Sequence, residues 1–224
     1  ETLDLIGVRR QRADSAAKFL DQDSKRNEDE RTTQQMFWDA AAQGDLGDLE
    51  ELLESDPAPE INGIDVSGNT ALHHAAAQGE ADIVARLLEV DGREVGVRNQ
   101  AGFTACLLGC DKGHADCVEV LIGAGATVDA APETAGEGGA AAAVGESAAT
   151  GLHLACVGGY DEVVEVLLTS ESSEAETPGP LVTHELLERR YRGLTALALA
   201  VRCGHLEIGR RLLAFGAVCD VHSA

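Results

Sequence analysis

Two adjacent histidines, His73 and His74, stand in the apolar run NTALHHAAAQG (residues 69–79) and are the first residues that suggest chemistry. Adjacent imidazoles raise the question of a metal site or an acid–base pair. Neighbours on a helix point about 100° apart, whereas two ligands of one metal ion usually come from positions four apart on one face. The pair is badly placed to chelate, so the elements that carry it must explain it.

Other candidates for chemistry are weak. The stretch HELLE (184–188) has Glu188 where the H-E-x-x-H zinc motif needs its second histidine. None of the six cysteines forms a C-x-x-C pair, and Cys106, Cys110, Cys117 and Cys156 are interpreted as small core residues. No phosphate-binding glycine loop or nucleophile elbow is present. We therefore expect no catalytic residue, no metal and no cofactor.

An internal repeat organises the chain. Four segments run from threonine to glycine in nine steps: TALHHAAAQG (70–79), TACLLGCDKG (104–113), TGLHLACVGG (150–159) and TALALAVRCG (195–204). Each glycine is followed eight and nine residues later by two aliphatic residues, such as Leu87 and Leu88. A degenerate fifth copy is QMFWDAAAQG (35–44). Each unit predicts a threonine N-cap, a short helix, a glycine at its end and a second helix.

This signature resembles the ankyrin repeat, whose T-P-L-H-x-A pattern is visible as TALHHA (70–75) and TGLHLA (150–155). The resemblance covers about residues 35–220 and implies an all-α solenoid of stacked helix pairs with short hairpin loops. It also implies that His73 and His153 form hydrogen bonds that tie neighbouring repeats together. His74, one residue further on, is expected to face the concave surface.

The spacing of the threonines predicts the domain organisation. An N-terminal arm (1–35), partly helical or flexible, precedes an ankyrin-repeat domain (36–224). Repeats are expected at about 36–69, 70–103, 104–149, 150–194 and 195–224, with insertions near 131–147 and 170–191 because the third and fourth exceed the family period. The apolar pair of the middle second helices becomes Asp48-Leu49 in the first repeat and Ile208-Gly209 in the last, as expected where an end faces no neighbour.

Charge is the most unusual compositional property, with 17 basic and 39 acidic residues and a formal net charge of -22. From Thr32 to Ala85 there are eleven acidic residues and no lysine or arginine, whereas residues 189–224 carry six basic and two acidic residues. Direct nucleic-acid binding is not expected, because phosphate binding depends on lysine and arginine. A field of one sign steers a cationic partner, so we expect a basic protein segment to lie against the first three repeats.

The candidate interface combines outward positions of the first helices, hairpin tips and acidic residues of the first repeats. Trp38, the only tryptophan, stands at the position equivalent to His73. It is either a plug of the N-terminal end or an exposed aromatic anchor. The candidate partner-binding residues are Trp38, Asp39, Gln43, Asp45, Asp48, Glu51, Asp65, Ser67, His74, Gln78, Asn99, Gln100, Asp111 and Lys112.

These features predict a non-enzymatic protein–protein interaction module, either an adaptor or a subunit of a larger assembly, whose acidic concave and hairpin surface binds a basic protein. Two alternatives stay open: a dedicated chaperone of a basic client protein, and the regulatory ankyrin fragment of a larger enzyme or channel. No stretch approaches the roughly 20 apolar residues that span a bilayer, so membrane insertion is not expected. The expected location is intracellular, cytoplasmic or nuclear, or organellar if a targeting segment has been removed.

Overall fold

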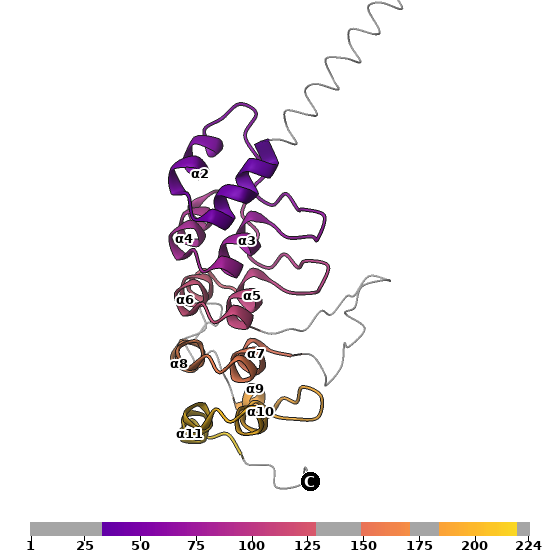
Figure 1. The fold of residues 1–224 in the computed structure, drawn as a ribbon, viewed down its shortest axis with the longest axis vertical. Helices are drawn as coiled ribbons and strands as arrows, with labels where there is room; N and C mark the ends of the chain where they lie inside the picture. Colours follow the sequence, from indigo (N-terminus) through magenta and orange to yellow (C-terminus); the bar gives the residue numbers. More distant parts are fainter. Residues whose placement is uncertain (1–32, 129–148, 171–183, 219–224) are drawn as a thin grey trace, which may run out of the picture.

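A computed structural model of the chain describes residues 33–128, 149–170 and 184–218. These residues form one stack of helix pairs, with the helix of each pair that comes first in sequence lying next to the projecting hairpins (Figure 1). The pairs are residues 33–43 with α2 (Leu46–Leu53), α3 (Ala71–Gln78) with α4 (Ala81–Glu89), α5 (Ala105–Lys112) with α6 (Ala115–Gly123), α7 (Gly151–Gly158) with α8 (Asp161–Thr169), and α10 (Ala196–Cys203) with α11 (Leu206–Ala214).

The remaining regular elements lie beside α10. The short helix α9 (His184–Glu188) contacts α10, and Tyr191 and Leu194 form an isolated antiparallel bridge. The described residues contain no β-strand, and the predicted all-α solenoid is confirmed. Residues 1–32 of the predicted arm, the insertion at 131–147 and residues 171–183 of the second insertion lie outside the described part.

The helix ends follow from the repeated threonine and glycine. The Thr104, Thr150 and Thr195 side chains accept hydrogen bonds from backbone N–H groups three residues later, which satisfies donors that a helix N-terminus leaves free. The first helices end on C-cap glycines with φ between +77° and +89°, in the left-handed region that glycine adopts without steric cost: Gly79, Gly113, Gly159 and Gly204.

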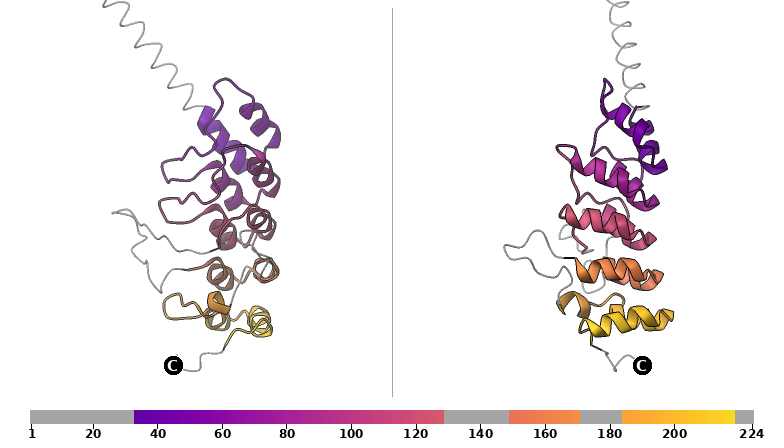
Figure 2. Two further views of the ribbon diagram at one scale, coloured as in Figure 1. Left: turned by 180° about the vertical axis from the view of Figure 1, so that it is seen from behind. Right: turned by 90° about the vertical axis from the view of Figure 1, so that its left-hand side faces the viewer.

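The core consists of two thin layers between neighbouring pairs. First helices contact first helices along the stack, and second helices contact second helices, an arrangement seen from the side in Figure 2. Small residues such as Ala71, Ala75 and Ala76 are fully buried, which allows close approach of α3 and α5. In the first pair Leu49 is buried while Asp48 is exposed, the pattern predicted for an end without a neighbour.

Candidate protein-interaction surface

His73 is part of the scaffold, as the sequence predicted. Its Nδ1 accepts a hydrogen bond from the backbone N–H of Thr70 at 3.1 Å, and its Nε2 donates to the carbonyl oxygen of Phe103 at 3.0 Å, in the following hairpin. His153 repeats this arrangement with Thr150 and the carbonyl oxygen of Arg189. Burial lowers the pKa of both imidazoles below the ordinary value, so both are neutral at pH 7.

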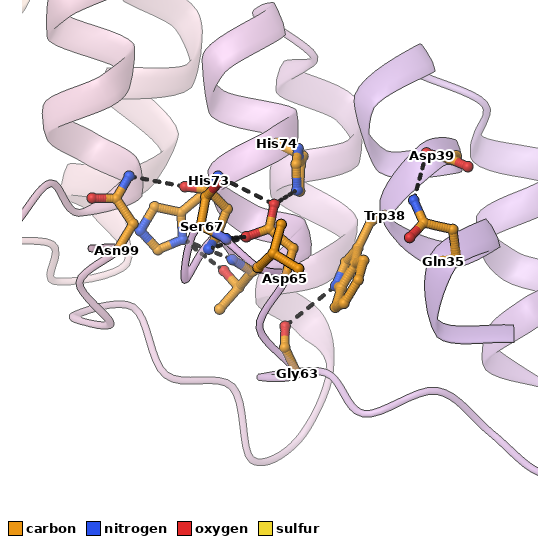
Figure 3. A network of polar contacts seen from close by, with 12 residues as sticks. Gln35, Trp38, Asp39, Gly63, Asp65, Ser67, His73, His74 and Asn99 are labelled. Carbon is orange, nitrogen blue, oxygen red and sulfur yellow. Dashed lines mark hydrogen bonds and ion pairs between the residues drawn. The ribbon is translucent and has the colours of Figure 1, made fainter. Parts of the chain in front are cut away.

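His74 lies between the hairpin that precedes α3 and the ring of Trp38, and it is held in place. Its Nε2 is 3.0 Å from Oδ2 of Asp65, and 28% of its side chain is exposed. On its other side the ring lies 6.5 Å from the ring of Trp38, measured between centroids (Figure 3). The part of His74 open to a partner is therefore the edge of a positioned ring, not a freely moving side chain.

Asp65 organises the hairpin that precedes α3. Its carboxylate accepts from the backbone N–H groups of Ser67 at 2.7 Å and Asn69 at 2.8 Å, besides the contact with His74. Burial acts to raise the pKa of Asp65, but the hydrogen bonds from Asn69 and Ser67 outweigh it, so the pKa is lowered and the carboxylate stays ionised. Asp65 is thus an internal cap of the hairpin.

The next hairpin uses Asn99 in the same way. Its Oδ1 accepts from the N–H groups of Ala101 and Phe103, and its Nδ2 donates to Oδ1 of Asn69 at 2.8 Å. Gln100 adds two further links between the hairpins, to the carbonyl oxygens of Val66 and Ser67. The two hairpins therefore form one hydrogen-bonded unit, and four candidate contact residues (Asp65, Ser67, Asn99, Gln100) help to hold it together.

Two exposed aliphatic residues on this unit were missed by sequence reasoning. Ile64 is 60% exposed and Val66 is 94% exposed, at the tip of the hairpin preceding α3. Their signal in the sequence was the alternation in INGIDVSG (61–68), where aliphatic residues stand beside the hairpin glycine. Exposed apolar side chains on a rigid loop are suited to contact another protein.

Trp38 is half-buried and hydrogen-bonded. Its Nε1 donates to the carbonyl oxygen of Gly63 at 3.3 Å, so the residue reaches into the following hairpin as His73 does one repeat later (Figure 3). The structure thus favours the packing role among the two alternatives that the sequence left open.

Five acidic or polar candidates gather at the N-terminal end of the stack. They border a groove of about 380 Å³ between residues 33–43 and α2, lined by Met36, Asp39, Ala40, Gln43, Asp45, Asp48, Glu51, Leu52 and Ser55. Asp45 also serves as the N-cap of α2, because its carboxylate accepts from the N–H of Asp48 at 3.0 Å. Met36, which sequence reasoning missed, is 55% exposed and gives the groove an apolar wall.

The other candidates lie apart from both groups. Gln78 and Lys112 are exposed near the ends of α3 and α5, and Asp111 is half-buried with its carboxylate 3.1 Å from the Lys112 ammonium. The structure thus divides the predicted residues into the hairpin unit with Trp38 and His74, the N-terminal groove, and three positions on the first helices.

Among the described residues, no three or more His, Cys, Asp or Glu side chains form a cluster that could hold a metal ion. Cys106, Cys110, Cys117 and Cys156 are buried, as the sequence indicated. Burial raises the pKa of Cys117 to about 11 and that of Cys156 to about 12, so both thiols stay protonated and poorly nucleophilic. Within the same residues no helix has the length and apolar character to cross a membrane.

Stacked helix pairs that project hairpins and a concave helical face define a class of protein-interaction modules. The family model described as "Ankyrin repeats (3 copies)" matches two segments of the chain, residues 37–131 and 139–223. The chain belongs to the ankyrin-repeat family.

Several longer proteins contain a region similar to this chain. The chain is 32% identical over 196 residues to probable E3 ubiquitin-protein ligase XBOS32 of Oryza sativa subsp. japonica, a match that covers 80% of this chain and 37% of the relative. It is 30% identical over 193 residues to E3 ubiquitin-protein ligase XBAT32 of Arabidopsis thaliana, a match that covers 80% of this chain and 35% of the relative. It is also 31% identical over 160 residues to B-cell lymphoma 3 protein homolog of Mus musculus, covering 70% of this chain and 31% of the relative. The chain thus spans about a third of the length of these relatives.

Proposed function

We propose that this chain is a non-catalytic binding module whose first three repeats hold a basic segment of another protein. One observation carries the proposal: residues 33–85, all within the described part of the stack, include eleven carboxylates and no lysine or arginine. A field of one sign over neighbouring repeats raises the association rate of a cationic partner and makes binding fall with salt.

The local surface supplies the short-range contacts that a field alone lacks. Ile64 and Val66 offer apolar area on the hairpin unit, and Asp39, His74 and Gln78 follow the first helices alongside it. Glu50 is partly neutralised by Arg86, whose Nε lies 3.3 Å from its carboxylate, at the edge of the acidic region. A segment that places basic residues along the helices and an apolar residue at the hairpin tips matches this surface.

Affinity capture from the native source, followed by quantitative mass spectrometry at about 0.05 M and about 0.5 M salt, tests the proposal. The informative variant combines Asp39→Lys with Asp48→Lys, because neither Asp65 nor Asp45 can be reversed without disturbing a hairpin or a helix cap. The matched control reverses Glu119 and Glu162, which are exposed on α6 and α8. The proposal is supported if the captured basic proteins are lost at high salt, and are lost with Asp39→Lys and Asp48→Lys but not with the control variant. Capture that is unchanged in Asp39→Lys with Asp48→Lys would reject both the proposal and the chaperone alternative.

A second candidate function is suggested by the relatives. Two of the similar proteins are named E3 ubiquitin-protein ligases, and the matched region is about a third of each. In this hypothesis the chain is the substrate-binding part of a ubiquitin ligase, a particular case of the regulatory-fragment alternative. Ubiquitin transfer by the complete reading frame to a captured protein, reduced by Asp39→Lys with Asp48→Lys, would support it. Absence of ubiquitin transfer by the complete reading frame would exclude it and leave the binding module unaffected.

A further inference from the structure

Inside the stack, each repeat covers fixed positions of the repeat before it. Ala76, Cys110 and Cys156 stand three residues before their C-cap glycines and are fully buried, as are Leu88, Ile122 and Leu168 on the second helices, all below a tenth exposed. In the last pair these two positions are Val201, which is 55% exposed, and Leu213, which is 49% exposed. The C-terminal end therefore presents an apolar stacking face with nothing on it among the described residues.

The N-terminal end presents the opposite half of the same junction. Ala71, Ala105 and Ala196 follow their N-cap threonines and are buried against the preceding repeat, whereas the equivalent Met36 is 55% exposed. The meeting point of the two halves is marked by Gly151, since a Cβ added there would lie 2.9 Å from Sγ of Cys110. In a junction between two molecules, the pairing seen for Cys110 and Gly151 would set Val201 of one molecule against Met36 of the other.

Ion pairs link the second helices of neighbouring repeats at the first and the last junction of the stack. Arg86 lies 3.3 Å from Glu50, and Arg211 lies 2.6 Å from Glu165. In both pairs the arginine stands seven residues after its own glycine, and the glutamate stands six residues after the glycine of the preceding repeat. At the N-terminal end of the stack the arginine position holds Glu51, and at the C-terminal end the glutamate position holds Arg210. The two charges are exchanged relative to the interior pairs but are still opposite.

The last pair also leaves room for larger residues at this junction. Val84, Val118 and Val164 fill one position of the interior second helices, and the last repeat has Gly209 there. A Cβ added at Gly209 would meet only Val201 and Leu197, at 3.7 Å and 3.8 Å. The missing side chain offers space for the Met36 side chain of the next molecule.

We infer that this protein binds a second copy of itself head to tail, with the last helix pair of one molecule stacked on the first helix pair of the next. Val201 and Leu213 pack against Met36 and Leu52, and Arg210 pairs with Glu51. Such an interface is heterologous, so each molecule retains a free end and association continues beyond a dimer. The inference goes beyond the proposed function, because it needs no other protein, although Met36, Glu51 and Leu52 also line the N-terminal groove.

Sedimentation of the full purified chain, from about 1 µM to about 1 mM, tests this inference at about 0.15 M salt, where long-range repulsion between acidic molecules is screened. The average mass should rise with concentration and pass that of a dimer. Val201→Asp should abolish the rise, because it sets an unpaired charge at the centre of the junction. Val157→Asp, an exposed substitution of the same type on α7, should leave association unchanged.

Charge exchange tests the register. Glu51→Arg and Arg210→Glu should each weaken self-association about fivefold to tenfold, as expected when an exposed pair becomes repulsive. An equimolar mixture of the two variants should recover wild-type association, because every junction between unlike molecules pairs opposite charges. Circular dichroism checks that each variant is folded.

Three results would overturn the inference: a monomer at every concentration, a mass that stops at a dimer, or a mixture of the charge variants no better than either alone. A monomer in which Met36 is protected from oxidation would show that a segment of the same chain covers the N-terminal end instead. All of these outcomes are measured without a partner protein, so they are independent of the capture experiment.

Discussion

The first and last helix pairs occupy the same repeat positions and carry opposite chemistry. Glu50 and Glu51 stand in the first pair where the last pair has Arg210 and Arg211, and Asp48 stands where the last pair has Ile208. Interior positions have neighbours on both sides and therefore keep buried residues of similar size. An end position has lost one neighbour, so its side chain is free to serve another purpose. The ends and the hairpins therefore carry the large residues that packing between described repeats leaves exposed, such as Met36, Val66 and Val201.

The largest expected effect on stability distinguishes His73, inside the stack, from Trp38 at the equivalent position of the first repeat. His73→Ala should lower the free energy of unfolding by about 3 kcal/mol, because it leaves a cavity and unpaired backbone groups at Thr70 and Phe103. Trp38→Ala, at the equivalent half-buried position, should cost about 1.5 kcal/mol. Urea unfolding followed by circular dichroism gives both values. Equal losses would mean that the end is as tightly packed as the interior.

A smaller effect distinguishes two carboxylates of the acidic region. Asp65→Ala should cost about 1.5 kcal/mol, because the N–H groups of Ser67 and Asn69 lose their acceptor. Asp48→Ala, on the exposed N-terminal end, should change the stability by less than about 0.5 kcal/mol. Urea unfolding followed by circular dichroism gives both values. A loss of more than about 0.5 kcal/mol for Asp48→Ala would show that the end face has a structural role.

Stability should also fall as the pH is lowered from 7 towards 5. In the folded protein the pKa values of His73 and His153 lie below the ordinary histidine value of about 6.5, because burial opposes the charging of both rings. Below pH 6.5 the unfolded chain therefore binds protons that the folded chain does not, and each histidine contributes a loss of at most about 1.4 kcal/mol per pH unit. His153→Gln should reduce the slope of unfolding free energy against pH. A slope unchanged in this variant would contradict the neutral, buried state of the ring.

The smallest effect is expected for the second histidine of the doublet. His74→Ala removes one contact with Asp65, which keeps its backbone hydrogen bonds, so the cost should be about 0.5 kcal/mol. The contrast with His73→Ala tests whether the adjacent rings have different roles. A loss as large as that of His73→Ala would make His74 a second structural tie.

The fold was predictable because its signals recur: threonine, glycine and aliphatic pairs at constant offsets are set by local capping and by burial. The candidate surface was less predictable. Asp65 and Asn99 read as free polar residues of hairpin tips, yet each accepts hydrogen bonds from its own hairpin. A sequence shows residue type and repeat position, but not which neighbouring donor already uses a side chain. For the same reason, Met36 and Val66 read as ordinary apolar residues although the structure exposes them.

Hydrogen exchange of the chain, alone and with a captured basic protein, locates the partner-binding surface. We expect slower amide exchange on binding within residues 36–82, where the carboxylates and hairpin tips lie, and unchanged exchange in α10 and α11. Slowing confined to α10 and α11, or absent from residues 36–82, would contradict the acidic N-terminal half as the partner-binding surface.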